Sequence, residues 1–414
     1  MVDLIYQKNC SDKIMDKKIS IIGGGLSGLV CSHFLLKKGL DVDLYECQNG
    51  LAKKFLVAGK GGLNLTHSEP TYKFSRKYFE HEEFFHELIS EFSSADLRQW
   101  LLELGVETFV GSSGRVFPSG CTAGEILAKI SSSLNNYSGF TLFKSHRLVG
   151  LNIEKELSFE TDNGLKKLRA DNIVLCLGGA SWSITGSDGK WSKIINSLGV
   201  KTNPFRPMNC GFEVAWNDPS SIDGKFLKNI CVKYPPHEKK GELLLTSYGL
   251  EGGAIYALSY FLEKELRNGV EVGITIDLKP DLSLETTILR LNSAKAKEST
   301  NTTLRKKLGL SVAALEILKN ATTKEEYFDK ITLANRIKSL PISLIGTRPL
   351  DEAISTSGGV DFDEVDQNLM LKNIPGVYVV GEMLDWQAPT GGYLFQGCIS
   401  MSHRVSKTLG DLLT

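Results

Sequence analysis

Buried strands and an amphipathic helix alternate in the first fifty residues. The run Lys18-Ile19-Ser20-Ile21-Ile22 is short and rich in β-branched residues, which is typical of a buried strand. Apolar residues then recur at helical spacing from Leu26 to Leu35, and two lysines with Gly39 end the pattern. A second strand at residues 41–46 finishes in an acidic residue. The pattern predicts a β–α–β unit.

Similar patterns predict the remaining elements of this first region and of the C-terminus. Residues 85–105 follow a helical period, and residues 148–168 read as short strands around an Asp-Asn-Gly turn. Apolar runs at 173–177 and 377–380 each lead into a glycine, and residues 394–409 have a helical period. We therefore expect two more parallel strands that end at ligand-facing glycines, and a long helix near the end of the chain.

The middle of the chain has a different character. Residues 270–276 alternate like an antiparallel strand, and residues 284–340 are mostly helical and rich in lysine and arginine. A length of 414 residues makes two or three domains the expectation. We predict an α/β fold with a discontinuous nucleotide-binding domain and an inserted domain. The predicted limits are 1–190 with 345–414 for the first, and 191–344 for the insert, β-rich at about 200–280 and helical at about 281–340.

Glycines occupy the first turn of the β–α–β unit. Gly23, Gly25 and Gly28 follow the first strand directly and open the helix, an arrangement that aims backbone N–H groups and a helix N-terminus at a pyrophosphate. Glu46 lies 18 positions beyond Gly28, close to the roughly 20 residues at which an acid reaches the ribose hydroxyls of an adenosine. The turn and the acid together predict a dinucleotide site; a glycine-rich turn without a ligand is the alternative.

Two segments near the C-terminus favour FAD over NAD. An FAD protein must also hold the ribityl chain and the isoalloxazine ring, and Gly381-Glu382 places an acid after a C-terminal strand. Residues 389–393, Pro-Thr-Gly-Gly-Tyr, precede the long predicted helix. The positive end of that helix suits the negative charge that reduced flavin carries at N1.

Two glycine-rich loops complete the predicted cofactor site. In the loop 58–67, Lys60 is placed to offset pyrophosphate charge and Asn64 to hydrogen-bond the flavin edge, whereas an ordinary tight loop is the alternative. Gly178 and Gly179 would let backbone approach the adenine or pyrophosphate, or form a plain strand-end turn. The complete predicted cofactor-binding set is Gly23, Gly25, Leu26, Ser27, Gly28, Glu46, Lys60, Gly61, Gly62, Asn64, Gly178, Gly179, Gly381, Glu382, Thr390, Gly391, Gly392 and Tyr393.

These glycine-rich segments, spread over nearly the whole chain, resemble one family. They are Gly23 to Gly28, Ala58 to His67, Leu177 to Ser181, Gly186 to Gly189, Ser357 to Val360, Gly381 to Asp385 and Pro389 to Gly397. The chain resembles the BaiN-like FAD-binding flavoproteins, also described as aminoacetone-oxidase-like. The resemblance implies one FAD, a Rossmann-type FAD-binding domain interrupted by an insertion with a β-rich part and a helical part, and an oxidoreductase of undefined substrate. The commoner loop of that family reads Gly-Arg-Cys-Asn where this chain has Gly61-Gly62-Leu63-Asn64, so no role is transferred from that arginine or cysteine.

No residue stands out as a catalytic acid or base. The weak candidates near the expected flavin end are His67, Asp385, Gln396 and Cys398. The alternative is that the histidine is structural and the cysteine is part of the core, which is the commoner role of such residues. Trp386 is a further candidate for covering the flavin, and His403 for donating a proton, each with a packing role as the alternative.

Composition and charge restrict which classes of partner and which metals are expected. Lysine plus arginine and aspartate plus glutamate each total 48, so the formal net charge is zero and a wholly cationic nucleic-acid binder is excluded. The eight cysteines form no Cys-x-x-Cys pair, so neither a zinc site nor a dithiol motif is predicted, and no metal is expected. Residues 1–15 lack the apolar run of a signal peptide, and no apolar stretch is long enough to span a membrane. We expect a cytoplasmic protein.

The expected reaction is hydride exchange at flavin N5 with a small molecule bound between the FAD-binding domain and the insert. The sequence has no second complete Gly-x-Gly-x-x-Gly after a strand, so NADPH or NADH would dock only transiently as electron donor. Residues 281–340 contain eleven basic and seven acidic residues, a balance of +4. Such an excess of basic residues usually marks a solvated helical face. The alternative is that it docks RNA, because the wider family has been linked to uridine reduction in ribosomal RNA.

Overall fold

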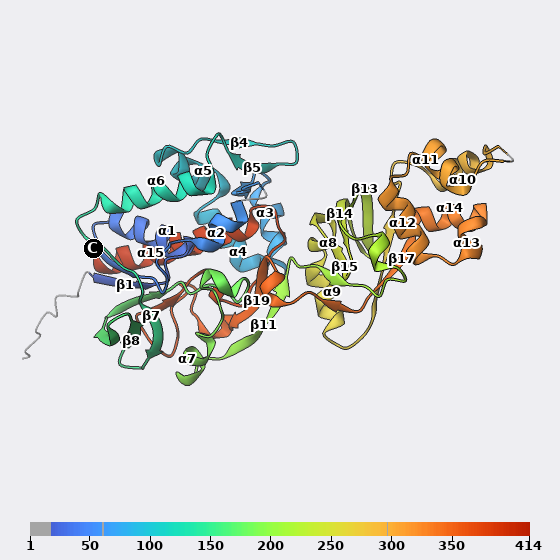
Figure 1. Ribbon diagram of the computed structural model, residues 1–414. Helices are drawn as coiled ribbons and strands as arrows, with labels where there is room; N and C mark the ends of the chain where they lie inside the picture. Colours follow the sequence, from blue (N-terminus) through green and yellow to red (C-terminus); the bar gives the residue numbers. More distant parts are fainter. Residues whose placement is uncertain (1–17, 60–61, 296) are drawn as a thin grey trace, which may run out of the picture.

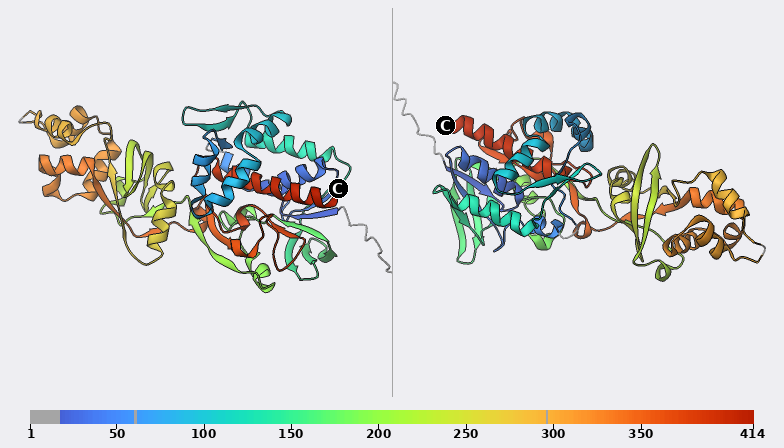
Figure 2. Two further views of the ribbon diagram at one scale, coloured as in Figure 1. Left: turned by 180° about the vertical axis from the view of Figure 1, so that it is seen from behind. Right: turned by 90° about the horizontal axis from the view of Figure 1, so that it is seen from above.

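The computed structural model describes residues 18–59, 62–295 and 297–414. They form two bodies joined by a narrow link, as all three views show (Figures 1 and 2). One hydrophobic core is built from residues 19–200 and 360–413, and a second from residues 210–353. The chain therefore passes between cores near residues 208 and 355. The predicted limits at 191 and 345 differ because α7 (Ser192–Ser197) packs on the first core and β18 (Gly346–Thr347) belongs to the sheet of the second.

A five-stranded parallel sheet organises the first body. Its order is β20-β10-β1-β2-β6, so the predicted β–α–β unit forms the centre of a Rossmann-type α/β fold. The strands are β1 (Lys18–Ile22), β2 (Asp41–Tyr45), β6 (Phe140–Phe143), β10 (Asn172–Leu175) and β20 (Val377–Val379).

Helices cover one face of this sheet, and a small antiparallel sheet covers the other (Figure 1). On the helical face α1 packs against both α15 and α6. On the opposite face the ring of Phe159 stacks on Tyr45 with centroids 4.7 Å apart. The covering elements are α1 (Leu26–Lys37), α4 (Glu82–Glu91), α5 (Ser94–Glu103), α6 (Ala123–Asn135), α15 (Tyr393–Leu413), β7 (Arg147–Leu151), β8 (Glu156–Thr161) and β9 (Gly164–Arg169).

The region predicted as one helix at 85–105 consists of two, α4 and α5. Ser93 ends the first and caps the second, because its hydroxyl accepts from the Asp96 N–H while Asp96 Oδ2 accepts from the Ser93 N–H at 2.8 Å. This capping box satisfies helix N–H groups that a continuous helix would use internally. The apolar period of Phe85, Leu88 and Leu97 carries across the break, which is why the pattern suggested a single element.

Short elements complete the first body and link it to the second. A three-stranded sheet of order β3-β5-β4 lies beside the N-terminus of α15, and β11 pairs antiparallel with β19 in the link between the bodies. These elements are α2 (Lys53–Ala58), β3 (Thr66–His67), α3 (Thr71–Phe74), the 3-10 segment η2 (Ser75–His81), β4 (Thr108–Val110), β5 (Arg115–Pro118), η3 (Ser183–Thr185), β11 (Thr202–Met208) and β19 (Ser355–Val360).

The second body contains a seven-stranded antiparallel sheet and a group of helices. The order β17-β16-β13-β14-β15-β12-β18 confirms the antiparallel strand predicted at 270–276. Helices α10 to α14 lie at the end remote from the first body, whereas α8 and α9 lie on the side nearer to it (Figure 1). Its strands are β12 (Phe212–Glu213), β13 (Lys225–Tyr234), β14 (His237–Thr246), β15 (Gly249–Glu251), β16 (Val272–Asp277) and β17 (Leu340–Leu344). Its helices are α8 (Gly253–Tyr256), α9 (Ser259–Leu266), α10 (Leu284–Asn292), α11 (Thr300–Leu308), α12 (Val312–Ala321), α13 (Lys324–Phe328) and α14 (Lys330–Lys338). None of the helices in the described residues is long and apolar enough to cross a membrane.

Candidate active site

A cavity of about 650 Å³ runs between the N-termini of two helices of the first body. One end is lined by the first turn, including Gly23, Gly25 and Glu46, and the other by Gly391 and Gly392 before α15. A volume of this order is within the range of ligand sites, roughly 300–1,000 Å³. The remaining lining comes from α2, from the loop after β10, and from Tyr256 of the second body.

The first turn leaves room for a ligand at the start of α1. Gly25 is the N-cap with ordinary extended angles, φ −71° and ψ −178°, and among the described residues no side chain caps the helix. A β-carbon on Gly25 would meet no described atom within 4 Å, so it would project into the cavity. Free N–H groups at a helix N-terminus facing open space are suited to a phosphate.

Glu46 lies at the end of β2 beside this turn. Its side chain is buried, with Oε2 accepting from the Gly24 N–H at 2.7 Å and Oε1 accepting from the Gln48 N–H at 2.8 Å. These two bonds fix the carboxylate in the cavity wall, where each oxygen retains lone pairs for a further donor. The position suits a carboxylate that accepts hydrogen bonds from ribose hydroxyls.

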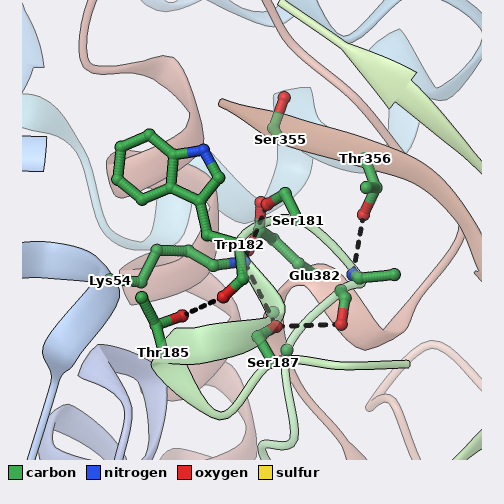
Figure 3. A network of polar contacts seen from close by, with 12 residues as sticks. Lys54, Ser181, Trp182, Thr185, Ser187, Ser355, Thr356 and Glu382 are labelled. Atoms are coloured by element: carbon green, nitrogen blue, oxygen red, sulfur yellow. Dashed lines mark hydrogen bonds and ion pairs between the residues drawn. The ribbon is translucent and has the colours of Figure 1, made fainter. Parts of the chain in front are cut away.

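A polar network crosses the middle of the cavity wall (Figure 3). Lys54 of α2 points its Nζ at Glu382 Oε2, 3.1 Å away, and donates to the hydroxyls of Ser181 at 3.0 Å and Ser187 at 3.2 Å. Ser187 in turn donates to the Gly179 carbonyl at 2.8 Å. The network ties α2 to the loops that follow β10 and β20, so the predicted acid Glu382 is held by a cation that sequence reasoning missed.

The N-terminus of α15 forms the second end of the cavity. Gly392 is its N-cap with φ +92°, and no side chain among the described residues caps this helix either. A β-carbon on Gly392 would lie 2.5 Å from Thr66 Cα, so only glycine allows β3 to pack against this turn. Cys398, one and a half turns along α15, also lines the cavity, and burial raises the pKa of its thiol to about 12. The thiol is therefore protonated at neutral pH.

Most of the predicted cofactor residues line this one cavity. Lys60 and Gly61 lie outside the described residues. The residues brought together are Gly23, Gly25, Leu26, Ser27, Glu46, Gly62, Asn64, Gly178, Glu382, Thr390, Gly391 and Gly392, with the catalytic candidate Cys398.

Three predicted glycines serve packing of the cavity wall instead of lining it. A β-carbon on Gly28 would lie 2.0 Å from the Gly23 carbonyl oxygen, and one on Gly179 would lie 2.2 Å from Thr356 Oγ1. Gly381 has φ +79°, and a β-carbon there would lie 2.6 Å from Ser27 Oγ. These glycines allow the turns and strand ends around the cavity to approach each other closely.

The polar groups of four other candidates are engaged in the fold outside the cavity lining. Tyr393 donates to Glu69 Oε1 at 2.6 Å, and its ring stacks on His67, whose Nε2 lies 3.0 Å from the Ser113 carbonyl. Asp385 accepts from the Gly358 N–H at 2.6 Å and from Asn203 Nδ2 at 2.8 Å. Gln396 accepts from Thr66 Oγ1 at 2.7 Å and donates to the Phe92 carbonyl at 2.9 Å.

Trp386 and His403 have packing environments. The indole of Trp386 is 2% exposed and donates to the Gly381 carbonyl at 2.8 Å. The ring of His403 stacks on Phe92, with centroids 4.7 Å apart, on the far side of α15 from the cavity lining. Burial lowers the pKa of His403, which keeps the imidazole neutral.

Several lining residues carried no usable signal in the sequence. Lys54 follows another lysine and looks like a solvated position, whereas Arg115 and Tyr256 come from segments 141 positions apart, 256 − 115, that only the fold brings to one cavity. Ser187 lies two residues after the Ser183–Thr185 turn. Its only indication in the sequence was its place in the Gly186 to Gly189 segment of the family resemblance.

The residues present suit an FAD molecule. The open space at Gly25 and the uncapped start of α1 among the described residues accommodate a pyrophosphate, and Glu46 is placed for the ribose. Lys54 and Glu382 line the middle, and the uncapped end of α15 accommodates the N1 and O2 edge of an isoalloxazine.

Comparison with known proteins identifies relatives over almost the whole chain. The model of the HI0933-like protein Rossmann domain matches residues 17–408. The 3-dehydro-bile acid delta(4,6)-reductase of Clostridium scindens is 23% identical over 92% of this chain and 95% of that protein. A ribosomal RNA dihydrouridine synthase of Haemophilus influenzae is 24% identical over 92% of this chain and 96% of that protein.

A solved structure supports the fold. The 3-ketosteroid-delta4-(5alpha)-dehydrogenase of Rhodococcus jostii RHA1, in complex with 4-androstene-3,17-dione, superposes with a TM-score of 0.52 at 16% identity. The alignment covers 97% of this chain and 98% of that chain. The predicted α/β, Rossmann-type fold with an inserted part is thereby confirmed.

Proposed function

Because the chain belongs to the HI0933-like protein Rossmann domain family and is an FAD-binding oxidoreductase, we propose that it exchanges a hydride between flavin N5 and a small molecule. The small molecule binds between the FAD-binding domain and the insert. The observation that carries the proposal is the continuous cavity from the N-terminus of α1 to that of α15, which Tyr256 of the second body also lines. Bound non-covalently there, FAD supplies the redox chemistry.

The residues of the chain bind, orient and shield the reacting groups. The start of α1 and Glu46 hold the adenosine diphosphate half, and the Lys54–Glu382 network fixes the middle of the cavity wall. The positive end of α15 stabilises negative charge at the flavin edge. Tyr256 contributes an apolar ring from the insert, and its hydroxyl donates to Glu251. Tyr256 covers part of the cavity from the second body, and this cover limits access of water to the reacting atoms.

A nicotinamide donor would bind only transiently at the flavin face. We therefore expect NADPH or NADH to bleach the flavin absorbance of the FAD-loaded protein under anaerobic conditions, and a small-molecule acceptor to restore it. Rapid mixing with each nucleotide, followed by a screen of enone and quinone acceptors, measures both half-reactions. A flavin that neither nucleotide reduces, or that no small molecule reoxidises after chemical reduction, would contradict the proposal.

An RNA-directed role is the second candidate, and the basic helical part of the insert favours it. Residues 281–340 carry a balance of +4, and this part lies at the end of the molecule remote from the first body (Figure 1). A relative named as a ribosomal RNA dihydrouridine synthase supports the same role. Binding of ribosomal RNA fragments that weakens steeply with salt, together with reoxidation of the reduced protein by that RNA, would favour this role. Binding that leaves the flavin redox-inert would mark it as RNA binding alone.

A further inference from the structure

Arg115 is a cation in the cavity wall that has no ion-pair partner in the part of the chain that the structure describes. It begins β5 and lines the cavity, yet among the described residues no carboxylate lies within ion-pair distance of it. Two other arginines illustrate the contrast: Arg348 forms ion pairs with Glu213 at 2.9 Å and Glu352 at 2.8 Å, and Arg404 with Glu91 at 2.9 Å. An arginine kept unpaired beside a cavity is available to a ligand.

We propose that the Arg115 guanidinium binds an oxyanion of the substrate, a carboxylate or a phosphate, at the α15 end of the cavity. The proposal deepens the proposed function and rests on it, because it concerns the substrate of that same site. It makes Arg115 a specificity-determining residue that selects anionic over neutral molecules.

The position of Arg115 is set by its neighbours in the fold. Its strand pairs with β3, where Arg115 lies opposite His67. A β-carbon on Gly391 would lie 3.8 Å from Arg115 Nε, so the guanidinium stem contacts the turn that precedes α15. The arginine therefore stands beside the helix N-terminus at which we place the flavin ring. The positive end of α15 and the guanidinium act on the same small region.

Two lysines add to this positive region from other elements. Lys77 lies in η2, and Lys239 lies in β14 of the second body. Partial desolvation lowers the pKa of Lys239, and the charges of Lys77 and Arg115 lower it further. Figure 1 shows β5 and β14 on the sides of the two bodies that face each other. Like charges from both bodies are thus held near one another, and Arg115 is the one of the three that lines the cavity.

The nearby acid offsets only part of this positive charge, because one carboxylate stands against three cations. Glu69 is the carboxylate that acts on Lys239, and it already accepts from the Tyr393 hydroxyl at 2.6 Å. Repulsion among Arg115, Lys77 and Lys239 is a cost that a bound anion would offset. A guanidinium presents parallel N–H groups that match the two oxygens of a carboxylate or phosphate. The chemistry therefore favours an oxyanion over a neutral carbonyl.

Binding of simple aromatic anions to the oxidised, FAD-loaded full-length protein tests the proposal without turnover. The probes are benzoate, phenyl phosphate and neutral benzamide, each followed by the change in flavin absorbance. We expect at least one anion to bind at least about 10-fold more tightly than benzamide, as for a hydrogen bond between charged groups. Tighter binding of benzoate identifies a carboxylate substrate, and tighter binding of phenyl phosphate a phosphate ester.

Three variants separate the role of Arg115 from general charge. Arg115→Met should remove the preference for the anion, and Arg115→Lys should keep part of it. Arg169→Met is the matched control, because Arg169 is an exposed arginine of β9 outside the cavity lining. The proposal is overturned if the unaltered protein shows no preference for either anion, or if Arg115→Met retains it. Reduction of the flavin by NADPH or NADH in these variants reports separately on the proposed function.

Discussion

Alanine at two glycines of the first turn separates contact with the cofactor from packing of the fold. Gly25 has allowed backbone angles for any residue, and its β-carbon would enter the cavity without meeting a described atom within 4 Å. Gly28 lies three positions later in the same turn, and its β-carbon would lie 2.0 Å from the Gly23 carbonyl oxygen. The same methyl group is therefore directed at a ligand in one variant and at backbone in the other.

The two variants should lose different properties, stability in Gly28→Ala and affinity for FAD in Gly25→Ala. Gly28→Ala places a methyl group against a carbonyl that cannot rotate away, and overpacking of this kind costs about 1–3 kcal/mol of unfolding free energy. Gly25→Ala should lower the unfolding free energy of the apoprotein by no more than about 1 kcal/mol, because glycine is a better N-cap residue than alanine. Its methyl group should displace the pyrophosphate and cost about one charge-assisted hydrogen bond, roughly 10- to 150-fold in FAD affinity.

Two measurements on each variant decide the matter. Urea denaturation of the apoprotein gives the unfolding free energy without the stabilisation that bound FAD would add. Quenching of FAD fluorescence gives the dissociation constant. A Gly25→Ala protein that binds FAD as tightly as the unaltered chain would refute the placement of the pyrophosphate at the start of α1. A Gly28→Ala apoprotein of unchanged stability would refute the packing argument.

Three further outcomes are expected. Glu46→Ala should weaken FAD binding by roughly 10- to 150-fold in the same titration, the worth of a hydrogen bond to a charged group; unchanged affinity would make Glu46 only a brace for the Gly24 N–H. Gly391→Val forces φ +131° on a branched residue and should displace the N-terminus of α15. The flavin reduction potential should then fall by roughly 20 mV for each kcal/mol of lost stabilisation of the reduced form. An unchanged potential in a folded, FAD-loaded variant would place the ring elsewhere. Burial lowers the pKa of His33 from 6.5 to about 4, so the unfolded chain binds its proton first as the pH falls. The unfolding free energy should therefore decrease by up to about 3 kcal/mol between pH 6.5 and 4, and His33→Gln should flatten that part of the profile in urea denaturation at several pH values.

Local pattern was sufficient to predict the main strands and two of the helices of the first body. The strand at 18–22, the helix from Leu26 and the helix at 394–409 each appear within a few residues of the predicted position, because their periodicity and their glycine stops lie in the same short segment. The break between α4 and α5 is also local, but the capping box at Ser93 competes with an apolar period that continues through it. The antiparallel strand at 272–277 follows the predicted alternation.

The cavity wall depends on contacts that no local pattern encodes. Lys54 meets Glu382 across 328 positions of sequence, and Arg115 and Tyr256 face one cavity from different bodies. The reverse holds for Gln396, which lies near the expected flavin in sequence while its amide is bound to Thr66 and to the Phe92 carbonyl. Nearness along the chain therefore predicts which residues lie close to the site. It does not predict which side chains face the cavity, because that depends on their hydrogen bonds to distant residues.

The identity and amount of the bound cofactor show whether the cavity holds FAD. We place the adenosine diphosphate at Gly25 and Glu46 and the flavin at Gly391 and Gly392, at the two ends of one cavity, so a dinucleotide should occupy both ends. Heat denaturation of the purified protein, followed by chromatography of the supernatant, should release FAD at about one molecule per chain. Recovery of FMN alone, or of no flavin from protein incubated with FAD and freed of excess, would contradict the account.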